Sequence, residues 1–150
     1  MVWAAAVGAG LSLIGANKEA RGYEKTGKRA LERGREQKVF NASQAQKVMA
    51  SGQAAAFEET RQMELMASRA VAVAAAGGSV SDIDHLLADI YGEGAYRASL
   101  VLREYEMEAD SLLFEGEQAE KYGADQQEGY KGKASATRYN AFASLFNMGF

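Results

Sequence analysis

The sequence predicts an all-α fold: an elongated helical hairpin of two long helices that turns near Gly77–Ser79. Three observations support this prediction. The 150 residues contain no proline, 29 of them are alanine, and Gly77-Gly78-Ser79 is the clearest helix-breaking signal in the chain. Alanine is the strongest helix former, whereas a β-sandwich or a loop-rich protein would normally contain proline at many turns. One domain accounts for a chain of this length.

Residues 1–16 form the first element, an apolar segment without a charged side chain until Lys18. A membrane-spanning helix needs about 20 apolar residues, so the segment is of borderline length, and it lacks the basic start of a secretory signal. Ala4 and Gly8, like Ala6 and Gly10, lie one helical turn apart, a spacing of small residues that allows close helix contact. A buried packing helix and a membrane segment both remain open interpretations.

Residues 17–76 are predicted to form a long first helix of some 60 residues, about 90 Å if it is unbroken. Small or apolar residues recur mostly three and four positions apart, at Tyr23, Gly27, Ala30, Gly34, Ala45, Met49, Gly52, Ala56, Met63, Ala67, Ala70 and Ala74. Glycines at 22, 27 and 34 weaken a helix, so a break is conceivable in the first third. A stripe of such small residues buries little area, which indicates that the chain needs oligomeric support, as a ring or bundle.

Residues 77–80 form the predicted turn, with Gly77 and Gly78 as its hinge. Ser81 then offers a helix cap, and carboxylates follow in the first turn. The second helix is predicted over 81–140, and its apolar stripe comprises Ile83, Leu87, Ile90, Gly94, Ala98, Val101, Tyr105 and Leu112. An apolar tail, 141–150, ends the chain.

A hairpin turning near Ser79 pairs residues whose numbers add up to about 158. Phe150 then lies near Gly8, and Phe142 lies near Ala16, so both apolar ends meet. Residues 18–47 carry nine basic and four acidic side chains, whereas residues 81–130 carry three basic and thirteen acidic ones. These opposite charges are expected to set the register, within one hairpin or between copies, more than to add stability.

The residue types that usually carry enzyme or metal chemistry are scarce. The chain has no cysteine, and its one histidine, His85, follows Asp84 and has Asp89 four residues further on, on the same helix face. One histidine and one carboxylate are too few ligands for a metal site, and a solvated helix start explains both. The acidic residues from Glu104 to Glu120 are distributed around the helix, as on a solvated face. We therefore expect no enzymatic activity, no metal and no cofactor.

A basic stretch from Lys18 to Lys38 is a candidate surface for DNA or a protein partner. Its candidate residues are Arg21, Lys25, Lys28, Arg29, Arg33 and Arg35. Four glutamates lie among them, so ion pairs at i,i+4 within the helix are the favoured alternative. Several copies around a channel would still present DNA with a ring of cations.

The sequence resembles the smallest internal virion protein, also called the core or ejection protein, of short-tailed bacteriophages of the T-seven type. The resemblance rests on the opening MVWAAAVGAG, the long Ala/Gln/Arg-rich helix, and the block SRAVAVAAAGGSVSDIDHLLADIYGEGAYRASLVLREYEMEADSLLFEGEQA. It touches most of the chain. The family's turn often carries a proline that is absent here, and longer relatives continue well past Phe150.

The resemblance implies a location in the virion interior, in a capsid core at the portal with larger internal proteins, and ejection ahead of the DNA. A homo-oligomeric channel across the host outer membrane, open to the periplasm, would follow, with non-specific contact to phage DNA. The residues implied in membrane insertion or oligomer packing are Val2, Trp3, Val7, Gly8, Gly10, Leu11, Leu13, Ile14, Phe142, Leu145, Phe146 and Phe150. Two alternatives remain: a soluble oligomeric helical scaffold or adaptor without membrane activity, and a membrane-lytic hairpin acting outside any virion.

Overall fold

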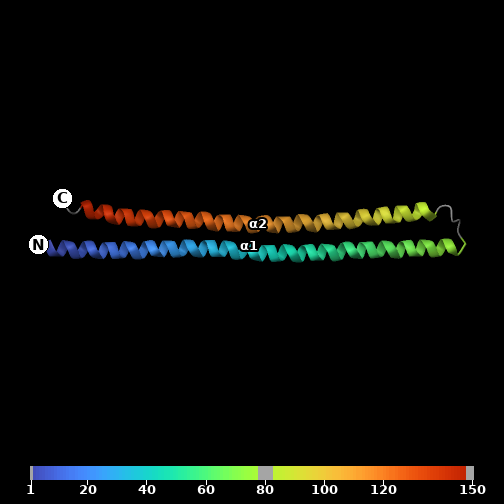
Figure 1. Cartoon of the computed structure of the whole chain (residues 1–150), viewed down its shortest axis with the longest axis horizontal. Helices are drawn as coiled ribbons and strands as arrows, with labels where there is room; N and C mark the ends of the chain where they lie inside the picture. Colours follow the sequence, from blue (N-terminus) through green and yellow to red (C-terminus); the bar gives the residue numbers. More distant parts are fainter. Residues whose placement is uncertain (1, 78–82, 148–150) are drawn as a thin grey trace. The chain divides into compact units, whose positions relative to one another are not determined.

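The computed structural model describes residues 2–77 and 83–147, with side chains described for 14–77 and 83–144. It contains two helices, α1 (Val2–Ala75) and α2 (Ile83–Asn147), which pack as a hairpin (Figure 1). No strand occurs among these residues. The predicted all-α hairpin is therefore confirmed.

The contacts group the chain into two units, each made of one segment of α1 and one segment of α2. Unit 1 comprises Met1–Phe40 and Glu115–Phe150, and unit 2 comprises Asn41–Phe114. Within each unit the two segments run antiparallel (Figure 1). Both helices continue from one unit into the other without an interruption in their hydrogen-bonded backbone.

Small residues fill the contact between the two helices of each unit. Among the described side chains, the buried apolar ones are all alanines: Ala20, Ala30, Ala45, Ala56, Ala67, Ala109 and Ala134. Glycines at 27, 34, 52, 94, 116 and 123 are buried among them. Every position of the two predicted stripes is buried or half-buried, so the predicted seam is confirmed.

The closest approaches occur at glycines. A Cβ atom built on Gly34 would lie 2.6 Å from the Ala119 carbonyl oxygen, and one built on Gly123 would lie 2.7 Å from that of Ala30. Facing residue numbers add up to 153 at these two contacts, and to 157 at Gly52–Tyr105 and Met63–Gly94. The register predicted from the sequence, about 158, is thus correct to within five residues.

The buried stripe repeats every 11 residues. Gly34, Ala45, Ala56 and Ala67 are all buried on α1, and Gly123 and Ala134 show the same spacing on α2. Eleven residues over three turns give 3.67 residues per turn, close to the 3.6 of an α-helix. Because 3.67 is slightly more than 3.6, the stripe drifts slowly around the helix, by about 20° per repeat, which is the pattern of a right-handed supercoil and not of a left-handed one.

The turn begins where the sequence places it. α1 closes with hydrogen bonds from the Ala76 amide to the carbonyls of Ala72 and Val73, both 3.2 Å, and Gly77 has φ of +150°, a conformation that favours glycine. Gly78 and Ser81 lie outside the described residues, and Asp84 is the acidic residue in the first turn of α2. Gly77 thus lies at the start of the turn, where the sequence places it.

Two predicted boundaries differ from the structure. α1 runs unbroken from Val2 through Gly22, Gly27 and Gly34, so the first third contains no break and the segment 1–16 is not a separate element. α2 continues to Asn147, which makes most of the predicted tail helical. The cost of each glycine, about 1 kcal/mol relative to alanine, is too small to interrupt a helix that is packed along its length.

Candidate membrane-facing and partner-facing surfaces

Glu120 on α2 joins the two helices of unit 1 through two cations of α1. The Lys38 ammonium donates to Glu120 Oε2 at 2.8 Å, and Arg35 Nε donates to Oε1 at 3.4 Å. Nearer the chain termini, Arg138 Nη2 lies 2.9 Å from Glu24 Oε1. The two contacts of Glu120 confirm that cations of the basic stretch of α1 face an acidic residue of α2, as the charge distribution predicted. The Glu24–Arg138 pair has the opposite polarity, with its acid on α1 and its base on α2.

The same contacts correct the favoured alternative for the basic stretch. Within the described parts of α1 between residues 18 and 47, no ion pair has the expected i,i+4 spacing; the ion pairs there join α1 to α2. Packing of α2 against α1 brings carboxylates of α2 close to the basic side chains of α1. Arg35 and Lys38 pair with Glu120 of α2 and not with a glutamate on their own helix. The ion pairs of the basic stretch therefore link the two helices of unit 1.

The ion pairs around Glu120 lower the pKa of the acid and raise the pKa of its lysine partner. The hydrogen bond and charge of Lys38, followed by those of Arg35, hold the pKa of the Glu120 carboxyl below its ordinary value. The carboxylate in turn raises the pKa of the Lys38 ammonium. In the folded hairpin the opposite charges of Glu120 and Lys38 stabilise each other, so both groups favour their charged forms.

These shifts predict a pH window for the contribution of the Glu120 ion pairs to stability. A lowered folded pKa means that the contribution of Glu120 is complete above its unfolded value of about 4.5 and is lost as the pH falls through the folded value. The raised pKa of Lys38 means that its contribution is lost as the pH rises through a value above 10.5. We expect Glu120→Gln to lower the urea midpoint slightly at neutral pH and to have no effect in strong acid.

Urea unfolding followed by circular dichroism at several pH values measures this window. Glu36→Gln is the matched control, because Glu36 is an exposed carboxylate without an ion pair among the described residues. Its midpoint should follow that of the unmodified chain at every pH. A constant difference between Glu120→Gln and the unmodified chain down to pH 2 would show that the effect is not electrostatic.

Two tyrosines add an aromatic contact to unit 1. The rings of Tyr23 and Tyr130 stack with centroids 6.3 Å apart and an interplanar angle of 22°. Lys133 Nζ lies 5.3 Å from the Tyr130 centroid, on the other helix from Tyr23. The Tyr23 hydroxyl donates to Glu19 Oε1 at 3.0 Å, and this hydrogen bond raises the pKa of Tyr23. Tyr130 was missed from the sequence because it lies beyond the end of the predicted apolar stripe.

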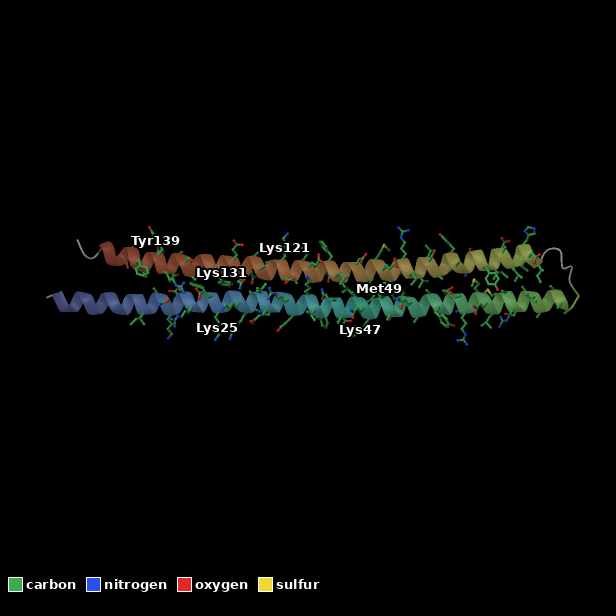
Figure 2. The ribbon with its side chains drawn as sticks, viewed as in Figure 1. Lys25, Lys47, Met49, Lys121, Lys131 and Tyr139 are labelled. Carbon is green, nitrogen blue, oxygen red and sulfur yellow. The ribbon has the colours of Figure 1, made fainter. Side chains whose placement is uncertain are left out.

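The six basic candidates are all exposed on α1. Arg35 is tied to Glu120, and Arg33 Nε donates to the Arg29 carbonyl at 3.3 Å. Lys25 projects from α1 on the side away from α2 (Figure 2). Arg21, Lys25, Lys28 and Arg29 make no ion pair among the described residues, and they form the accessible part of the predicted basic surface.

The apolar ends of the two helices meet in unit 1, as predicted. Ala16 and Asn17 of α1 line a hollow of about 320 Å³ together with Arg138, Ala141 and Phe142 of α2. The side chains of Ile14 and Phe142 are 69% and 56% exposed. The other candidates of this group lie outside the described side chains: Val2, Trp3, Val7, Gly8, Gly10, Leu11, Leu13, Leu145, Phe146 and Phe150.

Unit 2 contains a hollow of about 330 Å³ that is lined by both apolar and charged side chains. The apolar ones include Met63, Met66 and Ile90, and the charged ones are Glu59, Asp89, Glu93 and Arg97. Arg97 is bound to Glu93 at 2.8 Å. His85, the only histidine of the sequence, is exposed and is not among the residues that line this hollow. No group of three or more residues suited to holding a metal occurs among the described residues.

The outer side of α2 in unit 2 carries a row of large apolar side chains that the sequence reading missed. Tyr96, Leu100, Met107 and Phe114 are 59%, 45%, 60% and 62% exposed. Leu100, Met107 and Phe114 are spaced by seven residues, which is a detectable signal in the sequence. Val101, Tyr105 and Leu112 on the same helix form the inward stripe, and the sequence pattern alone does not predict a second apolar row beside it.

No described helical stretch combines the length and the apolar character needed to cross a membrane. Comparison with protein-family models, with curated proteins and with solved structures finds no match.

Proposed function

We propose that this chain is an internal virion protein of a short-tailed bacteriophage, a non-enzymatic subunit of the ejection machinery. It resides in the capsid core at the portal together with larger internal proteins. On infection it leaves the particle and contributes, as a homo-oligomer, to a channel through the host outer membrane. The proposal rests on the resemblance of the sequence to that family and on one structural observation.

That observation is the distribution of side-chain size in the hairpin. The buried positions of the contact between the helices are mostly alanine and glycine, and no large side chain is fully buried among the described residues. Phe57, Tyr96, Met107 and Phe114 are instead more than half exposed. Since burial of large apolar side chains supplies most of the stability of a folded protein, such a hairpin gains more from its neighbours than from its own interior. This is the behaviour expected of a subunit that exchanges one assembly for another.

The absence of cysteine and proline suits the proposed passage through a narrow tail. A chain without disulfides and without proline isomers has no slow covalent or isomerisation step to limit refolding after passage. The exposed cations of α1, including Arg21 and Lys25, would face phage DNA without reading its sequence, since phosphate contacts are independent of base identity.

A liposome experiment tests the membrane part of the proposal. The chain has one tryptophan, Trp3, so its fluorescence reports on the N-terminal segment alone. We expect vesicles to shift the Trp3 emission to the blue, to carry the full chain upward in flotation, and to release an encapsulated dye. A chain lacking residues 1–16 should neither float nor release dye, because it lacks the most apolar segment.

A matched pair of variants separates membrane insertion from general stickiness. Leu11→Asp with Leu13→Asp introduces two charges into the N-terminal segment and should abolish flotation. Val39→Asp with Phe57→Asp introduces the same charges at two side chains that are 70% exposed elsewhere, and it should leave flotation unchanged. If the full chain stays unbound and Trp3 emission does not move, the membrane role is refuted and a helical scaffold protein takes its place.

A further inference from the structure

The row on the outer side of α2 has the geometry of a helix-packing seam. Leu100, Met107 and Phe114 recur every seven residues, and Tyr96 lies four residues before Leu100. The positions between the three apolar residues are spaced by three and four residues, as in a heptad repeat. Each residue turns the helix by about 100°, so Met107 lies about 200° around the axis from Tyr105. Tyr105 packs against Gly52 of α1, which places Met107 on the opposite side, away from α1.

Two opposite charges lie within this row. Arg103 and Asp110 occupy the positions between the apolar residues, one turn before Met107 and one turn after it. Neither has an ion-pair partner among the described residues. The row therefore combines four large apolar side chains with one cation and one anion, which lie nearly symmetrically about Met107 and have no ion-pair partner among the described residues.

The geometry points to a second copy of this chain as the occupant of the row, packed antiparallel with its two-fold axis at Met107. In that arrangement Met107 meets Met107 of the second copy, and Leu100 meets Phe114. Arg103 of each copy then lies within one residue of Asp110 of the other, so the symmetry forms the ion pair twice. A parallel pairing would place arginine on arginine and aspartate on aspartate, so the charges select the antiparallel form.

This interface does not depend on the proposed function, because it follows from the outer face of unit 2 alone. It does carry one unfavourable contact: Glu106 borders the seam beside the axis and faces Glu106 of the second copy. Replacing that carboxylate by an amide removes a like-charge contact. Glu106→Gln should therefore lower the dissociation constant of the dimer. Non-specific association of an apolar surface does not predict this increase in affinity.

Single cysteines test the arrangement directly, since the chain has none of its own. Under mild oxidation, Met107→Cys should give a covalent dimer of the full chain. Leu100→Cys alone should not, because two such residues would be separated by 14 residues, about 21 Å, far beyond the reach of a disulfide. A mixture of Leu100→Cys with Phe114→Cys should form the mixed dimer. Ala95→Cys, an exposed position outside the row, is the control and should remain monomeric.

Charge reversal tests the ion pairs in the same face. Arg103→Asp or Asp110→Arg should weaken the dimer about tenfold in sedimentation equilibrium, and the double exchange R103D/D110R should restore it. Cross-linking of Leu100→Cys as fast as Met107→Cys would establish a parallel pairing and overturn the proposal. A monomeric chain without cross-links, or a double exchange that fails to restore the dimer, would overturn it as well.

Discussion

Gly34→Ala is expected to destabilise unit 1 by up to about 2 kcal/mol, although alanine is the better helix former. The added Cβ would lie 2.6 Å from the Ala119 carbonyl oxygen and 3.1 Å from the Glu120 Cα, so the backbone of α2 has to move. Overpacking of this kind costs about 1 to 3 kcal/mol, which outweighs a gain in helix propensity of about 1 kcal/mol. The urea midpoint, followed by circular dichroism, should fall. Gly123→Ala meets the Ala30 carbonyl in the same way and should behave alike.

Gly22→Ala is the matched control on the same helix. A Cβ atom there has nothing within 4 Å, so only the gain in helix propensity remains. The variant should raise the urea midpoint, with a gain of about 1 kcal/mol. Equal shifts of Gly34→Ala and Gly22→Ala, in either direction, would show that the close approach of the two helices at Gly34 does not exist in solution.

Ala67→Leu is expected to destabilise unit 2 by about 1 to 3 kcal/mol. Ala67 is 3% exposed, and it belongs to the stripe of buried small residues that repeats every 11 positions on α1. Three additional carbon atoms have to push α2 away, and neighbouring contacts of the stripe loosen with it. Thermal unfolding by circular dichroism should show a lower midpoint.

Ala54→Leu supplies the comparison, because Ala54 is exposed on α1 within the same unit. Leucine and alanine are both good helix formers, so this variant should change the stability by less than about 0.5 kcal/mol. If Ala67→Leu raises the midpoint instead, the contact between the helices has room for large side chains, and the small-residue packing described above is wrong.

Much of the fold can be predicted from the sequence because it depends on local signals. The missing prolines and the Gly77-Gly78-Ser79 signal predict two helices and a turn, and the inward stripe from Tyr23 to Ala74 is confirmed throughout. The register follows from the position of the turn alone. The charge distribution correctly predicted that cations of α1 face acids of α2, as Lys38 and Glu120 do.

What the sequence could not supply depends on the partner helix. Gly27 and Gly34 suggested a weak or broken helix, since their role is visible only once the backbone of α2 lies against them. The ion pairs at i,i+4 were favoured for the same reason: the carboxylate of Glu120 is 82 residues away from Lys38 in sequence. The outer row of Leu100, Met107 and Phe114 is not predicted by the inward stripe of the same helix, and it becomes evident only once the structure shows which side of α2 faces away from α1.

The stripe of alanine and glycine also determines how the hairpin responds to a pulling force. Its buried contacts recur along α1 at small residues, and no large side chain is fully buried in the part of the chain that the structure describes. Pulling α2 away from α1 at one end therefore breaks the contacts in sequence, each step costing little more than the one before. Such a structure opens like a zipper under low and nearly constant force, and it recloses from any point at which the register is regained.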